Sequence, residues 1–188
     1  VRDSESLMAL TLISTHTASA DASIDITSGI TSTYDSYEFH CVSMHPATDA
    51  VDFGFQVNAV DLTGFDEVIT STAFVAYHNE ADTTTVLSYH TGKDQAQTQL
   101  YQTICSYATG NDNDQSVSGV LKLYAPSSPT YVKHFTAEGN GAYGDGSDYS
   151  VALYVAGYIN TTAAIDEISF KFSSGNIDAG TIKMFGVS

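Results

Sequence analysis

The stretch from Ile165 to Ser188 constrains the fold more than any other, because hydrophobic and polar side chains alternate along it. On one side of an extended chain lie Ile168, Phe170 and Phe172, and on the other lie Glu167, Ser169 and Lys171. This period of two is the signature of a half-buried β-strand. Turn-forming residues interrupt it at 173–176, and alternation resumes at 181–185. The stretch therefore predicts two antiparallel strands at the end of the chain.

The same alternation recurs along the rest of the chain, and it is cleanest between Val51 and Asn58. There we expect Val51, Phe53, Phe55 and Val57 to face inward, and Asp52, Gly54, Gln56 and Asn58 to face outward. Further extended segments are expected at 7–15, 24–26, 34–44, 67–78, 83–90, 100–108, 117–124, 130–137 and 149–159. The last of these is apolar enough to be buried on both sides, or to lie near the centre of a sheet.

Two segments interrupt the extended pattern. Residues 93–99, with the sequence KDQAQTQ, are the one place where a helical turn is plausible, although no apolar stripe supports it. Residues 138–148 carry four glycines, so we expect a loop there. About a dozen short strands without a convincing helix predict an all-β fold, an antiparallel β-sandwich of the jelly-roll type. No internal repeat or linker is visible, so we expect a short N-terminal arm at 1–6 and a single domain at 7–188.

The charge of the chain excludes several classes of partner. The formal net charge is −16 over 188 residues. A field of this sign repels phosphate backbones and anionic lipid surfaces, so we expect neither nucleic-acid binding nor membrane insertion. No apolar run approaches the roughly 18 residues that a membrane-spanning helix needs. The first residues also lack the basic segment and cleavage site of a signal peptide, so we expect none.

Candidate chemistry is sparse in this sequence. Cys41 and Cys105 lack the spacing of a zinc or redox motif, and they are interpreted as buried inert thiols or as a disulfide. The acidic segment from Asn111 to Asp114 fails the EF-hand pattern, and it is either a solvated hairpin tip or a calcium site. The segment 144–148 has the same two interpretations. His78-Asn79-Glu80 resembles a base with an orienting carboxylate but has no nucleophile beside it. We therefore predict no catalytic, metal-binding or cofactor-binding residues and no enzyme.

Tyrosine is abundant, with 12 residues against no tryptophan. Tyrosine supplies rigid apolar area with a polar tip, which suits contact surfaces as well as sheet interiors. Tyr143 and Tyr149 flank the glycine-rich segment and are candidates for exposure. They are interpreted either as sheet aromatics and loop anchors or as part of a contact surface for a partner or a glycan.

Three segments of the chain, 22–59, 110–128 and 154–188, resemble short structural proteins of marine tailed bacteriophages. The closing phrase SSGNIDAGTIKMFG is the most specific part of this resemblance. The resemblance implies a virion surface protein, either a capsid decoration protein or a fibre-like appendage, that is assembled in the host cytoplasm and exposed to the extracellular medium. It implies other capsid or tail proteins as partners, and a homo-oligomer, with a trimer favoured. It carries no catalytic motif.

A second function remains open on the same fold, that of a carbohydrate- or receptor-binding module. This alternative predicts a groove lined by tyrosine and aspartate near residues 138–148, with a host-surface glycan as the partner. Whether the protein belongs to the head or the tail of a particle is left open by the sequence.

Overall fold

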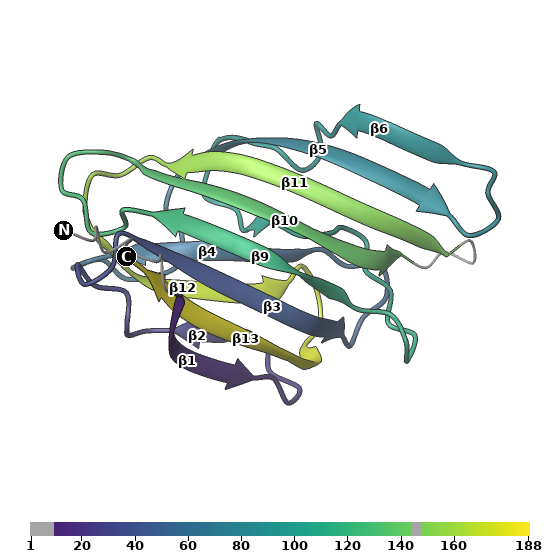
Figure 1. Cartoon of the computed structure of the whole chain (residues 1–188), viewed down its shortest axis with the longest axis horizontal. Helices are drawn as coiled ribbons and strands as arrows, with labels where there is room; N and C mark the ends of the chain where they lie inside the picture. Colours follow the sequence, from purple (N-terminus) through teal and green to yellow (C-terminus); the bar gives the residue numbers. More distant parts are fainter. Residues whose placement is uncertain (1–9, 144–147) are drawn as a thin grey trace, which may run out of the picture.

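The computed structural model describes residues 10–143 and 148–188, and within them every regular element is a β-strand (Figure 1). The strands are β1 (Leu10–Thr17), β2 (Ile24–Ile26), β3 (Ser36–Pro46), β4 (Phe53–Ala59), β5 (Ile69–Asn79), β6 (Thr85–Tyr89), β7 (Gln95–Thr98), β8 (Gln102–Thr103), β9 (Val117–Tyr124), β10 (Lys133–Tyr143), β11 (Tyr149–Ile159), β12 (Ile165–Phe172) and β13 (Ile177–Val187). The expected arm at 1–6, the start of the first expected strand and residues 144–147 lie outside the described residues. The described part contains no helix that could cross a membrane.

The strands form two antiparallel sheets that pack face to face, which confirms the all-β sandwich. The larger sheet has the order β1-β13-β3-β9-β10-β11-β5-β6, with β7 also paired to β5. The smaller sheet has the order β2-β12-β4-β8. In Figure 1 the larger sheet passes in front of β4 and β12, and β5 and β6 extend beyond the smaller sheet. The smaller sheet therefore leaves part of the larger sheet's inner face to be covered by other segments.

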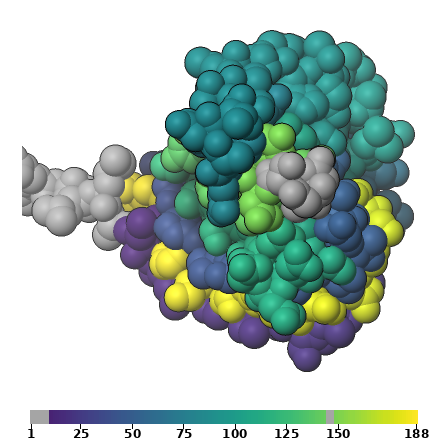
Figure 2. All heavy atoms as spheres, turned by 90° about the vertical axis from the view of Figure 1, so that its right-hand side faces the viewer, coloured from purple at the N-terminus to yellow at the C-terminus, as the bar shows by residue number. Residues whose placement is uncertain are grey.

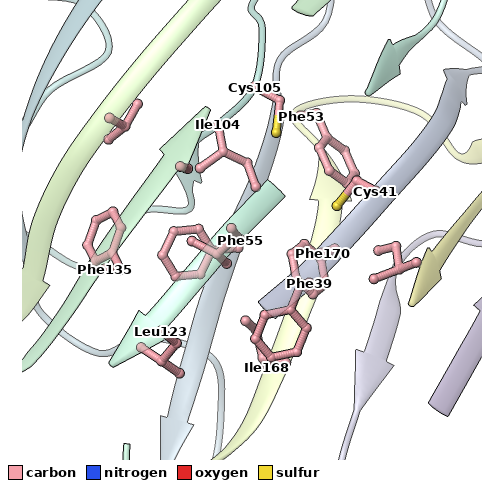
Figure 3. Close-up of a cluster of buried hydrophobic side chains, with 14 of the residues drawn as sticks. Phe39, Cys41, Phe53, Phe55, Ile104, Cys105, Leu123, Phe135, Ile168 and Phe170 are labelled. Atoms are coloured by element: carbon pink, nitrogen blue, oxygen red, sulfur yellow. The ribbon is translucent and has the colours of Figure 1, made fainter. Parts of the chain in front are cut away.

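Phenylalanine side chains from both sheets form the centre of the sandwich (Figure 3). Phe170 of β12 lies against Phe39 of β3, with ring centroids 5.6 Å apart. Phe55 of β4 meets Phe135 of β10 edge to face at 5.0 Å. All four rings are at most 1% exposed. Because each pair joins one sheet to the other, burial of these rings holds the two layers together.

Both strands predicted at the end of the chain are present, but they do not pair with each other. β12 lies between β2 and β4 in the smaller sheet, whereas β13 lies between β1 and β3 in the larger one. The turn between them therefore carries the chain across the sandwich. Gly175 in this turn has a φ of +71°, a left-handed conformation that glycine adopts without strain.

The helical turn considered for residues 93–99 is wrong, because β7 occupies this segment. β7 pairs with β5, and Gln97 takes a φ of +56°, which a right-handed helix does not allow. The Gln97 side chain donates a hydrogen bond to Thr70 Oγ1 at 2.7 Å and accepts one from Asn160 at 3.0 Å. Pairing with an existing sheet edge thus decides the conformation of a segment that has little preference of its own.

Residues 54, 56 and 58 lie on the second face of β4, but the solvent exposure expected for them is wrong, because β4 is buried on both faces. Neighbouring loop segments lie against this face at Gln56. Gln56 is fully buried, and its side-chain amide donates to the carbonyl oxygens of Glu67, Gln99 and Leu100. Backbone carbonyls therefore replace the water that we had expected to solvate this side chain. Of the strand expected at 100–108, only the two residues of β8 are regular.

The loop expected at 138–148 is wrong for residues 138–143, because β10 continues to Tyr143, and residues 144–147 lie outside the described residues. Gly139 of β10 and Gly119 of β9 are paired, and the segment around Cys105 crosses over both. A Cβ atom on Gly139 would lie 2.5 Å from Cys105 Cβ. The glycines at 119 and 139 thus allow close approach of another backbone rather than a turn.

Cys41 and Cys105 are free thiols, and both are buried in the same part of the core (Figure 3). The interpretation as buried thiols is therefore confirmed, and the disulfide alternative is wrong. Burial raises the pKa of Cys41 well above its ordinary value, and neighbouring Cys105 adds to the effect. Burial, with a contribution from Glu138, raises the pKa of Cys105 to about 12. Both thiols are consequently kept neutral and unreactive.

We expect this burial to appear as alkaline destabilisation. The folded pKa of Cys105 lies above its ordinary value of 9.0, so its contribution to stability is complete below pH 9 and decreases as the pH rises towards about 12. Relative to the Cys105→Ala variant, the native protein should lose about 1.5 kcal/mol of unfolding free energy between pH 9 and about pH 10.5. Urea unfolding at each pH measures this loss. Parallel pH profiles of the two proteins would contradict the assignment.

Candidate functional site

The outward surface of the nine-stranded sheet carries several exposed apolar side chains. Two neighbouring rows of paired residues cross its middle, and we call them together the outer face. The first row is Lys183, His40, Val120, Glu138, Tyr154, Phe74 and Tyr89. The second row is Leu12, Phe185, Glu38, Lys122, Thr136, Ala156 and Thr72. Leu12, Phe74 and Tyr89 are each about half exposed.

A shallow hollow lies in the middle of the outer face. Its volume is about 350 Å³, and Phe74, Val120, Tyr124 and Tyr154 contribute to its lining. The rings of Phe74 and Tyr154 are stacked with their centroids 4.9 Å apart and their planes within 8° of parallel. Cross-strand pairing of β5 and β11 holds these two rings in place. The hollow therefore combines fixed aromatic walls with the charged side chains of Lys122 and Glu138, and it is open to solvent.

The charged groups of the outer face balance one another. Glu38 accepts hydrogen bonds from His40 Nε2 at 2.9 Å and from Lys122 Nζ at 3.0 Å. Burial raises the pKa of Glu38, but these two partners outweigh it, so the pKa lies below its ordinary value. Glu138 and Lys183 add one charge of each sign. The outer face is thus close to neutral in a chain whose net charge is −16.

A second concave feature lies on the inner side of the sheet, where β5 and β11 extend beyond the smaller sheet. Tyr77, Tyr107, Tyr143 and Tyr149 line it together with Val151, and we call it the tyrosine cleft. The ring centroids of Tyr77 and Tyr149 are 5.7 Å apart at 87°, and those of Tyr143 and Tyr149 are 5.7 Å apart at 60°. Tyr107 lies 6.3 Å from Tyr143. The four rings therefore stand as walls at steep angles to one another.

Polar and charged groups border the tyrosine cleft at Tyr107. The His90 ring meets Tyr107 edge to face at 4.8 Å, and Lys93 Nζ lies 5.5 Å from the Tyr107 ring centroid. Lys93 is held by an ion pair with Asp52 Oδ2 at 2.5 Å. Burial raises the pKa of Tyr107, as do Tyr77, Tyr143 and Asp52. Burial and Lys93 lower the pKa of His90. Tyr107 and His90 are therefore both uncharged at neutral pH.

The predicted acidic tip, Asn111–Asp114, lies at the end of the sandwich that faces the viewer in Figure 2, as does the connection between β5 and β6. Gln115 anchors the tip, since it is 6% exposed and its carbonyl oxygen lies 2.7 Å from His45 Nδ1. Asp112 and Asp114 are exposed. No group of three or more acidic, histidine or cysteine side chains within the described ranges is arranged to hold a metal.

The structure brings together some of the residues that sequence reasoning selected and not others. Tyr143 and Tyr149 do lie side by side, and Asp148 precedes the second of them. Their partners Tyr77 and Tyr107 were missed, because they come from segments distant in the chain. His78 contacts Asp82 at 3.1 Å on the exposed surface. The outer face was missed because single-strand alternation shows which residues share a face, not whether that face becomes covered.

No protein-family model, no curated protein and no solved structure matches this chain.

Proposed function

We propose that this protein is a non-enzymatic structural protein of a bacteriophage virion surface that acts through protein–protein contacts. The outer face is the observation that carries the proposal. It combines exposed aromatic rings, a hollow with aromatic walls and balanced charge, which are features of protein contact surfaces. The resemblance to virion structural proteins supplies the setting, either as a capsid decoration protein or as a fibre-like appendage.

The electrostatic argument favours contact at the outer face over other parts of the surface. Two molecules with a net charge of −16 repel each other. Salt screens this repulsion at separations beyond about 8 Å, but the repulsion persists between charges that come closer than that. The outer face has two lysines opposite two glutamates, so close approach there adds little repulsion. It is therefore a surface at which copies of an acidic protein can meet.

A second copy of this chain is the partner that we propose for the outer face. In a closed assembly, Lys122 and Lys183 of one copy can lie beside Glu38 and Glu138 of the next, while the rings at 74 and 154 pack into the opposite hollow. The resemblance favours a trimer, whereas pairing one outer face with another gives a twofold dimer, and the mass of the assembly distinguishes the two. Further partners would be other capsid or tail proteins.

The combined Phe74→Ser and Tyr154→Ser variant tests this proposal. We expect the native protein to form a stable oligomer of its 20.0 kDa chain, and the variant to be monomeric. Loss of buried aromatic contacts at the centre of an interface costs about 2 kcal/mol or more. Size-exclusion chromatography with light scattering measures the mass, and mass spectrometry of purified virions shows whether the native chain is present on particles.

The matched control removes the same number of exposed apolar groups elsewhere. Leu62→Ser combined with Tyr131→Ser does so in loops outside the outer face, where these residues are 58% and 71% exposed. This control should keep the native mass. A native protein that is monomeric and absent from purified virions would refute the proposal.

The second candidate function, a carbohydrate- or receptor-binding module, is favoured by one observation. Tyr143 and Tyr149 line the tyrosine cleft, and Asp148 lines the neighbouring hollow, close to the segment where this function predicted a groove. A glycan array tests the carbohydrate form of this candidate, and a flat profile would count against it.

A further inference from the structure

We propose that the tyrosine cleft binds a methylated or quaternary ammonium group through cation–π contacts. This inference goes beyond the proposed structural role and does not depend on the outer face. It specifies the ligand of the second candidate function: the receptor that the module binds would carry a methylated or quaternary ammonium group.

The arrangement of rings is the first observation that supports this ligand. An ammonium group is attracted by an aromatic face when it lies within about 6 Å of the ring centroid. Adjacent rings of the cleft are 5.7 to 6.3 Å apart and meet at 50° to 87°. A cation seated among them is therefore within reach of several rings at once, which no flat stacking platform offers.

The size of the cleft is the second observation. Its volume is about 180 Å³, and its lining consists of four tyrosines and Val151. Pockets for drug-sized ligands occupy about 300–1,000 Å³. The cleft therefore fits a small group such as trimethylammonium, either free or at the end of a longer chain. Among the described residues, its lining contains no side-chain amide or carboxylate of the kind that fixes the orientation of a sugar's hydroxyl groups.

The charge around the cleft is the third observation. Tyr149 also lines the neighbouring hollow, whose other lining residues include Glu80, Asp114 and Asp148. These carboxylates favour a cation over a neutral or anionic ligand. The protein's own Lys93 already lies over the Tyr107 ring, and Asp52 pairs with its charge. Tyr107 therefore already has an ammonium group 5.5 Å from its ring centroid.

Choline chloride and 3,3-dimethylbutan-1-ol form a matched pair of probes, because the alcohol has the same shape without the charge. We expect saturable choline binding by NMR titration at low ionic strength, and binding of the alcohol that is about tenfold weaker or more. Equal binding of both probes, or no choline binding, would overturn the proposal. Binding of neutral hexoses in place of choline would also overturn it, and would support the carbohydrate form of the second candidate.

Variants of the cleft locate the site. Tyr149→Leu and Tyr107→Leu should each weaken choline binding about tenfold, because each removes an aromatic face. Tyr149→Phe keeps the ring and should bind within about threefold of the native protein. Tyr131→Leu, on a loop away from the cleft, is the control and should leave the affinity for choline unchanged. If Tyr149→Leu proves unstable in thermal unfolding, the comparison of Tyr149→Phe with Tyr107→Leu still tests whether choline binds in the cleft.

The oligomer mass separates this inference from the proposed function. Cleft variants should leave the mass unchanged, whereas outer-face variants should leave choline binding unchanged. Choline binding that is lost together with the oligomer would show that the cleft is not an independent site.

Discussion

Gly139→Ala should abolish stable folding, or lower the free energy of unfolding by about 3 kcal/mol or more. The new methyl group would lie 2.5 Å from both Cys105 Cβ and the Ser118 carbonyl oxygen, and 2.8 Å from Cys105 Cα. Backbone atoms and a Cβ cannot rotate away, so the segment around Cys105 would have to separate from the sheet. Urea unfolding followed by circular dichroism measures the loss.

Gly92→Ala is the control for this prediction. Its added methyl group would meet the His90 ring at 3.4 Å, an ordinary contact, and its φ is not in the left-handed region. We expect a change of less than about 1 kcal/mol. If Gly139→Ala is tolerated as well as Gly92→Ala, the close crossing of residue 105 over β9 and β10 is wrong.

Phe170→Ala should lower the free energy of unfolding by about 3–5 kcal/mol. The Phe170 ring is fully buried, and it contacts Phe39 of the opposite sheet at 5.6 Å and Phe53 of its own sheet at 6.1 Å. Removing it leaves a cavity between two sheets that cannot collapse without moving whole strands. Thermal and urea unfolding both measure the effect.

Phe74→Ala makes the same substitution at an exposed phenylalanine of the outer face, and we compare its effect with that of Phe170→Ala. Phe74 is 47% exposed, and its main neighbour is the stacked ring of Tyr154. We expect a loss of about 1 kcal/mol or less in monomer stability, together with weaker self-association. A large loss of monomer stability for Phe74→Ala would show that the outer face is part of the folding core instead of a contact surface.

Much of the strand content was predictable from local patterns. The boundaries expected for 117–124 and 149–159 agree with β9 and β11. In β11, buried Val151, Leu153 and Val155 alternate with more exposed neighbours, and the strand lies between β10 and β5. The place of β11 inside a sheet therefore agrees with one of the two expectations for 149–159. The other expectation, burial on both sides, is met by β4 instead.

Local patterns failed where a distant segment supplied the missing partner. Glycines 139 and 141 looked like loop residues, because glycine is common in turns, yet here they admit another backbone against the sheet. Lys133 is another case. It is fully buried, its ammonium group donates to the carbonyl oxygens of Tyr131 and Thr161, and burial lowers its pKa. Single-sequence reasoning places a lysine at the surface.

The candidate surfaces were likewise predictable only in part from the local sequence. Tyr143 and Tyr149 were identifiable from sequence because they flank one glycine-rich segment, but the cleft needs Tyr77 and Tyr107 from other parts of the chain. The outer face depends on which side of the larger sheet the smaller sheet covers. Neither arrangement has a local signal, since both arise from contacts between segments far apart in the chain.

The sequence by itself determined that this chain forms short strands, that inward and outward side chains alternate along them, and that the chain carries a net charge of −16. These properties follow from side-chain period and net charge, which are local or additive. Only the tertiary structure decided which faces are covered, which glycines receive another backbone, and which tyrosines form a cleft. Those outcomes depend on strand order across two sheets, and long-range pairing is what a period of two residues leaves undetermined.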